Sequence, residues 1–193
     1  FNGKDAYGSL LQDFNNDGWI DCFLSQFGEN KLFLNNKKGT FNQDFDSDGK
    51  QSKSTGCSYA DFDRDGDLDI FVANKNDLSR VYLNPTNKNN FLFIKLTGVV
   101  SNRDAIGTKV YFYESGDSLK KLIGYREIQA QCGYLSSCEP TIHFGTGKYQ
   151  SIDIRIVYPS GNEVEQFNLI PGNYYDYAEY NIVISKILFG LNV

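Results

Sequence analysis

The sequence predicts an all-β protein built from two different units. Two nearly identical acidic segments, residues 13–21 and 61–69, are each followed by a short apolar run of strand-forming residues. Their first aspartates lie 48 positions apart (61 − 13), which indicates an internal repeat. After residue 90 the acidic segments stop, and apolar residues alternate with polar ones over residues 151–158, as in a half-buried strand. Because few stretches have helical periodicity, we expect strands and turns along the chain.

Both acidic segments have the spacing of a cation-binding loop. Oxygen-bearing side chains occupy positions 1, 3, 5 and 9, and position 6 is a glycine, which permits a positive φ. Calcium prefers six to eight oxygen ligands at about 2.3–2.6 Å, so a short loop must curl tightly to supply them. The predicted ligands of the first loop are the side chains of Asp13, Asn15, Asp17 and Asp21 and the carbonyl of Trp19. Those of the second loop are the side chains of Asp61, Asp63, Asp65 and Asp69 and the carbonyl of Asp67, with water completing each shell.

Two alternatives compete with this interpretation of the loops. An EF-hand loop opens in the same way but needs a bidentate Glu at position 12, where this chain has Leu24 and Val72. Acidic clusters with Asn and Gly also form plain solvated turns. Two matching loops, each followed by the same strand pattern, favour calcium sites over solvated turns.

A third acidic cluster begins like the two loops but departs from them. It contains Asp44, Asp46 and Asp48, yet position 9 is Ser52 and no apolar strand follows. We expect an acidic turn there, or at best a weak third calcium site.

The acidic loops lie inside a longer repeat. Residues 8–13 align with residues 56–61, and residues 30–35 align with residues 79–84. A period near this length, made of short strands and turns, is typical of propeller blades. Residues 1–88 resemble two of the calcium-binding FG-GAP or VCBS repeats of integrin α propellers. The resemblance implies that each acidic loop joins two strands of a blade and holds a structural calcium. Because propellers typically have four to eight blades, we expect an incomplete ring of β-propeller-type blades.

The second half of the chain predicts a different β unit. A polar stretch at residues 84–90 is typical of a linker. Strands are expected at residues 91–97, 109–113, 151–158 and 163–167. This pattern most simply predicts a β-sandwich-like domain over residues 89–177.

This second unit resembles the ASPIC/UnbV domain. The matching pieces are residues 101–107 with Val110, residues 126–127, residues 133–136, residues 143–147 and residues 158–161. The family usually has Trp where Tyr158 stands and Leu where Thr146 stands, and both changes keep a plausible packing role or loop. The two resemblances together cover about residues 5–177. The resemblance to the ASPIC/UnbV domain implies an architecture rather than an activity.

The excess of acidic residues is explained mostly by the predicted calcium ligands. Lys and Arg number 19 and Asp and Glu number 24, giving a formal net charge of −5. Seven aspartates supply predicted calcium ligands through their side chains, so two bound Ca²⁺ ions would bring the charge to −1 (−5 + 4). This balance argues against a nucleic-acid partner, which requires a basic face. No block of Lys and Arg suggests an anionic membrane surface.

The four cysteines fit a secreted protein. Cys132 and Cys138 flank a turn-like stretch, and we expect a disulfide between them. Cys22 is interpreted as a small apolar core residue, with a Cys22–Cys57 bridge as the less favoured alternative. Because the chain starts at Phe1 and contains no Met, we expect a piece of a longer or processed protein with further blades upstream.

Residues 178–193 form an apolar C-terminal tail. The tail contains Lys186 and is shorter than the roughly 20 residues that span a bilayer, so no membrane span is predicted. It is expected to pack as a final strand on its own domain. The alternative is self-association, in which the tail adds to an exposed sheet edge of a neighbouring subunit.

The sequence favours a protein that is not an enzyme. The single His, His143, lies in a strand-like stretch and is expected to be structural, and no catalytic motif is present. We expect a calcium-binding extracellular or cell-surface protein that serves adhesion, matrix or surface assembly and has a protein or glycan partner. The alternative is an accessory glycan-binding module of a polysaccharide-acting enzyme. In that case Tyr174, Tyr175 and Tyr177 would contact the glycan, although the same residues also suit ordinary strand packing.

Overall fold

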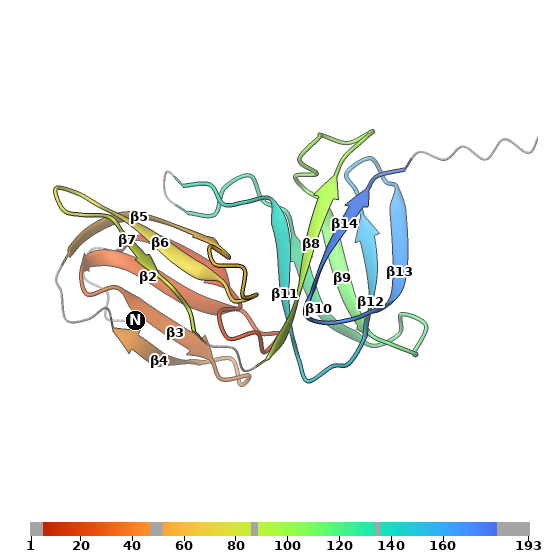
Figure 1. The fold of residues 1–193 in the computed structure, drawn as a ribbon, viewed down its shortest axis with the longest axis horizontal. Helices are drawn as coiled ribbons and strands as arrows, with labels where there is room; N and C mark the ends of the chain where they lie inside the picture. Colours follow the sequence, from red (N-terminus) through yellow and green to blue (C-terminus); the bar gives the residue numbers. More distant parts are fainter. Residues whose placement is uncertain (1–5, 47–51, 86–88, 134–135, 181–193) are drawn as a thin grey trace, which may run out of the picture.

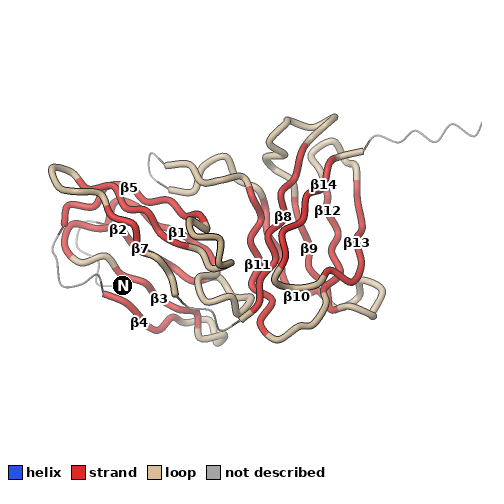
Figure 2. Tube along the Cα trace, in the orientation of Figure 1, coloured by secondary structure: helices blue, strands red, loops and turns tan. Residues whose placement is uncertain are grey.

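The computed structural model describes residues 6–46, 52–85, 89–133 and 136–180. Within these ranges the chain forms fourteen strands and no helix (Figure 2). The strands build two units that lie side by side (Figure 1), and the predicted all-β fold of blades followed by a sandwich is confirmed. In the described part of the chain, no helix is long and apolar enough to cross a lipid bilayer.

The repeat unit is one curled, seven-stranded sheet. Its strands are β1 (Ala6–Gln12), β2 (Asp21–Gly28), β3 (Lys31–Asn35), β4 (Phe41–Asp46), β5 (Ser52–Ala60), β6 (Asp69–Asn74) and β7 (Arg80–Tyr82). Strands β1 to β4 pair antiparallel in chain order and form the first blade, and β5 to β7 do the same in the second. The blades join where β2 pairs with β5 at Phe27–Lys53 and Gly28–Ser52. The result is the predicted incomplete ring.

The apolar strands that follow the acidic loops carry the core of the repeat unit. Phe23 in β2 and Val72 in β6 are fully buried. The same cluster contains Leu10, Phe14, Cys57, Leu68, Ile70 and, from the second unit, Phe93. Because Phe93 packs into this cluster, the two units share part of one core.

The second unit is a sandwich of two sheets. Its strands are β8 (Asn90–Thr97), β9 (Lys109–Glu114), β10 (Leu122–Glu127), β11 (Thr141–Gly147), β12 (Ile152–Val157), β13 (Glu163–Leu169) and β14 (Asn173–Ala178). One sheet has the order β10-β9-β12-β13 and the other the order β11-β8-β14, in which β14 runs parallel to β8. Ile152, Ile154 and Ile156 point into the core between the sheets, as their alternation predicts.

The cysteines divide into one disulfide and two thiols. Cys132 and Cys138 form the predicted disulfide, with a Cα–Cα distance of 5.7 Å. Cys22 and Cys57 are free and buried, and burial raises the pKa of both thiols. The structure therefore supports the core role expected for Cys22 and does not contain the Cys22–Cys57 bridge.

The third acidic cluster differs from its prediction as a turn. Asp44 and Asp46 lie in β4, which pairs along β3, so the backbone there is an extended strand. Asp48 lies outside the described residues. The weak third calcium site stays a prediction, since Asp48 is one of its three aspartates.

The start of the predicted tail is part of the sandwich. Ala178 ends β14, and the side chain of Glu179 is fully buried. Its Oε2 atom accepts hydrogen bonds from the backbone amides of Val99 (2.9 Å) and Ser101 (2.7 Å). Burial alone would raise the pKa of Glu179, but hydrogen bonds from Ser160, Ser101 and Val99 lower it to about 2. Residues 181–193, on which the self-association hypothesis depends, lie outside the described residues.

Candidate metal centre

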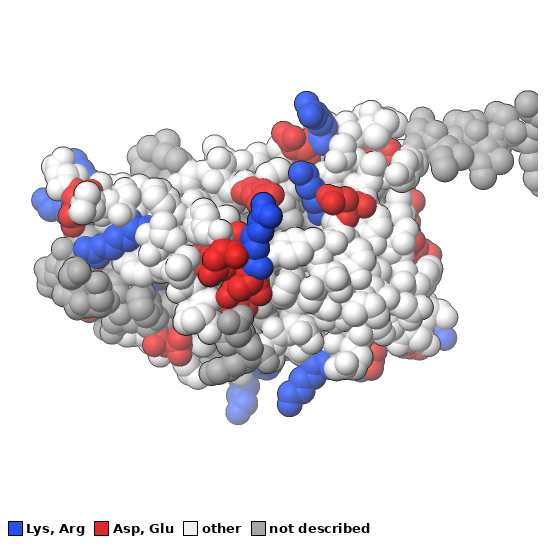
Figure 3. All heavy atoms as spheres, viewed as in Figure 1, with Lys and Arg blue, Asp and Glu red and all other residues white. Residues whose placement is uncertain are grey.

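The two acidic loops occupy equivalent places in the two blades. The first connects β1 to β2, and the second connects β5 to β6. Both lie at the end of the repeat unit that faces the sandwich (Figure 1). We call the region where the two units meet the seam, and acidic side chains gather there (Figure 3). The resemblance implied that each loop joins two strands of a blade, and the structure has this arrangement.

The loops repeat one hydrogen-bond network almost atom for atom. In the first loop, Asp13 accepts hydrogen bonds from the amides of Asp17 (3.1 Å) and Gly18 (2.7 Å). In the second, Asp61 accepts the equivalent bonds from Asp65 (3.2 Å) and Gly66 (3.1 Å). These bonds curl each loop around its first carboxylate, which is the shape that a bound cation requires.

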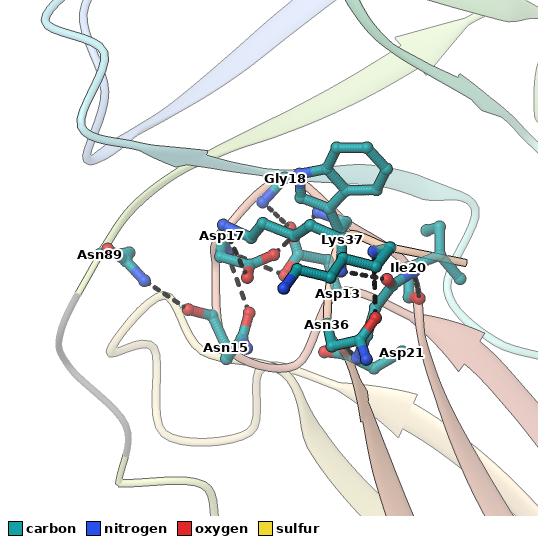
Figure 4. A network of polar contacts seen from close by, with 12 residues as sticks. Asp13, Asn15, Asp17, Gly18, Ile20, Asp21, Asn36, Lys37 and Asn89 are labelled. Carbon is teal, nitrogen blue, oxygen red and sulfur yellow. Dashed lines mark hydrogen bonds and ion pairs between the residues drawn. The ribbon is translucent and has the colours of Figure 1, made fainter. Parts of the chain in front are cut away.

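Positions 3 and 5 join the same network. Asn15 Oδ1 and Asp63 Oδ1 accept hydrogen bonds from the amides of Asp17 (3.2 Å) and Asp65 (3.3 Å) respectively. Asp17 Oδ1 in turn accepts from the amide of Trp19 at 3.0 Å (Figure 4). The side chains at positions 1, 3 and 5 therefore turn toward one another within each loop.

The backbone adopts a left-handed conformation at two positions of each loop. The predicted glycines have positive φ angles, 91° at Gly18 and 95° at Gly66. The residues at position 4 also have positive φ, 57° at Asn16 and 63° at Arg64. The left-handed conformation at position 4 was not predicted, although Asn in the first loop is a residue type that tolerates it.

The aspartates at position 9 tie each loop to its blade. Asp21 accepts hydrogen bonds from the amides of Phe14 (2.9 Å) and Asn35 (2.8 Å), one at each carboxylate oxygen. Asp69 makes the same pair of bonds with the amides of Phe62 (2.8 Å) and Asn84 (2.8 Å). The structure thus gives these two predicted ligands a structural role that spacing alone did not reveal.

The residues present fit a calcium ion. Carboxylate oxygens of Asp61, Asp63 and Asp65 lie within 4.8 Å of one another, so one cation could contact all three. The side-chain donors in both loops are oxygen atoms, which a hard cation such as Ca²⁺ prefers. When bound, the ion would supply positive charge at the point where the carboxylates converge. Asp61, Asp63 and Asp65 would hold it in the second loop, and Asp13, Asn15 and Asp17 in the first.

Burial disfavours the ionised form of several of these carboxylates. It raises the pKa of Asp13 to about 6, against hydrogen bonds from Gly18 and the charge of Arg126. It raises the pKa of Asp21 to about 7 and also raises that of Asp69. Nearby carboxylates add to the effect at all three positions. The ion-free loops therefore hold negative charge at an energetic cost, which a cation would offset.

We expect the calcium-free protein to become more stable as the pH falls from about 7.5 to about 5.5. The folded-state pKa values of Asp13 and Asp21, about 6 and about 7, lie above the value of 3.8 for a free aspartate. The folded state therefore binds more protons than the unfolded state in this window, so acidification favours folding. Thermal melts in chelator across this range test the prediction. A melting temperature that fell on acidification would contradict it, and the Asp13→Asn/Asp21→Asn variant should lose the effect.

The two loops touch each other. Asn16 Nδ2 donates to the carbonyl of Gly66 at 3.2 Å and to Asp67 Oδ1 at 2.6 Å. Asn84, which follows β7, donates to the carbonyl of Phe14 at 2.6 Å. These bonds connect the first loop to the second across the blades.

The sandwich closes over the first loop. The amide of Gly147 donates to the carbonyl of Asn16 at 3.0 Å, and Asn89 Nδ2 donates to the carbonyl of Asn15 at 2.9 Å. Gly145 lies so close that an added Cβ would sit 2.2 Å from Asp13 Oδ2. The loop and β11 are therefore in direct backbone contact.

In each loop, one side chain of the sandwich reaches the first carboxylate. Arg126 of β10 lies 4.0 Å from Asp13 Oδ2, and its Nη2 atom donates to the carbonyl of Gly18 at 3.3 Å. Tyr174 of β14 donates its hydroxyl hydrogen bond to Asp61. Neither residue was predicted to belong to the site. Arg126 was noted only among the pieces that resemble the ASPIC/UnbV domain.

The tyrosines of β14 are engaged in packing. Tyr174 stacks on Phe93 with ring centroids 4.9 Å apart, and the Tyr175 hydroxyl bonds to the backbone of Ile170. Tyr177 packs against the sandwich core. The packing interpretation of these residues therefore has more support than the glycan-contact interpretation.

His143 is a core residue at the seam. It is buried beside Phe93, and burial lowers its pKa to about 3, helped by the charge of Arg126. A neutral, buried imidazole suits the structural role that was expected.

Two family models match this chain. One, described as an FG-GAP-like repeat, matches residues 13–72, and the other, described as ASPIC and UnbV, matches residues 98–181. The chain contains an FG-GAP-like repeat followed by an ASPIC and UnbV domain. The resemblance stated from the sequence is confirmed, and the two acidic loops fall within the matched FG-GAP-like segment.

The chain is also similar to cartilage acidic protein 1 of two vertebrates. The Xenopus tropicalis protein is 27% identical over 169 residues, which cover 79% of this chain and 25% of the relative. The Homo sapiens protein is 29% identical over 121 residues, covering 60% of this chain and 17% of the relative. The chain thus spans about a quarter or less of the length of these relatives.

Proposed function

We propose that this protein is a non-catalytic, calcium-binding extracellular protein that serves adhesion, matrix or surface assembly. The observation that carries the proposal is the repeated loop network, in which the oxygens of three side chains turn toward one point in each blade. Calcium bound there stabilises the folded state, because the unfolded chain does not hold the ligands together.

The location and the partner class are part of the same proposal. The Cys132–Cys138 disulfide is typical of proteins in oxidising, extracellular compartments. The relatives carry the name cartilage acidic protein 1, and cartilage is a tissue rich in extracellular matrix. A protein or glycan of the matrix or cell surface is the partner that fits this setting.

The loops also lie where calcium would act on the whole molecule. They contact each other and the ASPIC/UnbV domain through the bonds of Asn16 and Arg126. Calcium that orders the loops would therefore hold the two units in one arrangement. We propose a structural rather than a regulatory role for the ion.

Calorimetric titration of the chelator-stripped protein with Ca²⁺ is expected to show two binding events. Asp61→Ala/Asp65→Ala should remove one event, because those side chains form part of the second loop. Ca²⁺ should raise the melting temperature of the parent. At extracellular-type affinities of roughly 10⁻⁴–10⁻³ M, physiological calcium would fill the sites.

The matched control is Asp104→Ala/Asp117→Ala, which removes the same charge from exposed positions in the sandwich. It should keep both binding events. No binding by the folded parent would mean that the loops are solvated turns and would remove the physical basis of the proposal.

An accessory glycan-binding module is the second candidate. A cavity of about 1220 Å³ opens where the blades meet the sandwich, and Trp19, Tyr82 and Tyr149 line it together with polar side chains. Aromatic faces beside polar groups suit sugar rings. Binding of a soluble polysaccharide that Trp19→Ala abolishes in a folded protein would favour this candidate.

A further inference from the structure

We infer that the two loops are unequal calcium sites, and that Lys37 and Arg126 weaken the first by supplying resident positive charge. The second loop then binds Ca²⁺ more tightly. This inference rests on the proposed calcium function and adds which residues of this chain set the affinity of each site.

Lys37 places an ammonium group on the first loop. It follows β3 in the turn before β4, and its Nζ atom lies 3.1 Å from Asp17 Oδ2. Figure 4 shows its side chain lying across the loop beside Asp13 and Asp17. Asp17 is a predicted ligand, so Ca²⁺ entering the first loop must compete with this ion pair.

Arg126 places a second positive charge on the same loop from the opposite unit. Its guanidinium lies 4.0 Å from Asp13 Oδ2 and donates to the carbonyl of Gly18. The side chain is 11% exposed and its charge lies over the ring of Phe144, 5.0 Å from the centroid. Because this group is buried and held in place, water screens its charge poorly, and its repulsion of a second cation is strong.

The second loop has a different electrostatic environment. Its first carboxylate, Asp61, accepts a hydrogen bond from the neutral hydroxyl of Tyr174. The equivalent carboxylate of the first loop, Asp13, faces the positively charged Arg126. Among the residues that the structure describes, no Lys or Arg forms an ion pair with Asp61, Asp63 or Asp65.

The charge totals follow from these contacts. In the first loop, positions 1, 3, 5 and 9 carry three carboxylates, and Lys37 and Arg126 reduce the net charge to −1 (−3 + 2). In the second loop, positions 1, 3, 5, 7 and 9 carry five carboxylates, and the exposed Arg64 leaves −4 (−5 + 1). Since more ligand charge raises the calcium affinity of a loop, we expect the second site to bind at least about tenfold more tightly.

The single tryptophan makes the two sites separable. Trp19 occupies position 7 of the first loop, and its amide bonds to Asp17. Terbium is a luminescent substitute for calcium, and excitation of tryptophan sensitises an ion bound beside it. Tryptophan-sensitised terbium luminescence therefore reports the first loop, whereas calorimetry with Ca²⁺ reports both.

The experiment uses the full chain, stripped with chelator and titrated in parallel by both methods. In the parent, calorimetry with Tb³⁺ should also show two events, and the tryptophan-reported Tb³⁺ midpoint should coincide with the weaker of them. Lys37→Gln should shift this midpoint to about threefold lower concentration, as expected for one half-exposed ion pair, and leave the tighter event unchanged. Lys120→Gln, an exposed lysine on the β9–β10 turn, is the matched control and should shift neither event.

Variants at two further positions, Asn15 and Arg126, keep the inference testable without relying on one surface charge. Asn15→Asp gives the first loop the carboxylate that Asp63 provides in the second, and should tighten the tryptophan-reported event. Arg126→Gln should tighten it more than Arg126→Lys, which keeps the positive charge. If Arg126→Gln fails to fold, the Asn15→Asp and Lys37→Gln results decide.

Each outcome has a distinct meaning. Two sites of equal affinity, or a tryptophan-reported midpoint that Lys37→Gln does not shift, would overturn this inference and leave the calcium function standing. No calorimetric binding at either loop would overturn both this inference and the proposed calcium function.

Discussion

Replacing Gly145 by alanine is expected to destabilise the protein by about 3 kcal/mol and to disturb the first loop. The added Cβ would lie 2.2 Å from Asp13 Oδ2 and 2.3 Å from the backbone carbon of Asn16. A backbone atom cannot rotate away as the end of a flexible side chain can. The loop and β11 must separate to make room, which stretches the Gly147–Asn16 hydrogen bond of 3.0 Å.

Urea denaturation measures the loss of stability, and the fluorescence of Trp19 reports whether the first loop has moved. Gly116→Ala is the matched control, because a Cβ there would meet no atom within 4 Å. Its φ of +85° adds a backbone cost of only about 1 kcal/mol. A Gly145→Ala variant no less stable than Gly116→Ala would show that β11 and the first loop are not in close contact.

Replacing Phe144 by alanine is expected to have the largest effect of any single substitution proposed, about 3–5 kcal/mol. The ring is buried and stacks on Phe112, with centroids 3.9 Å apart. It packs directly over Gly124, where a Cβ would lie 2.2 Å from the ring. Removing it leaves a cavity in the sandwich core. It also removes the face over which the Arg126 guanidinium lies.

Chemical denaturation gives the stability change, and calcium titration of any folded fraction shows whether the first site is altered. Phe167→Ala tests the same residue type on the surface of the same sandwich, since Phe167 is 52% exposed. It should change stability by less than about 1 kcal/mol. Similar losses for the two variants would contradict the assignment of Phe144 to the core.

The local elements of this protein follow from nearby residues. The strands after the acidic loops were predicted because apolar, strand-forming residues follow Asp21 and Asp69 directly. The Cys132–Cys138 bridge was predicted because only a short turn separates the two residues. β4 was an exception: residues 44–49 have the composition of a turn, but pairing with β3 stabilises an extended strand up to Asp46. A neighbouring strand overrides local preference in this way because it satisfies the backbone hydrogen bonds of the segment.

The two loops follow from local sequence alone, since each closes on hydrogen bonds between residues only two to seven positions apart, such as Asp13 to Asp17 and Asp21 to Phe14. Spacing is sufficient there because the short chain has few other ways to satisfy its amides. The surroundings of each loop depend instead on the three-dimensional packing of the two units. Arg126 reaches Gly18 across 108 positions and Tyr174 reaches Asp61 across 113. Such contacts depend on how the sandwich packs against the blades, and no local pattern encodes that packing. For this reason the loops look alike in sequence and differ in charge once the chain is folded.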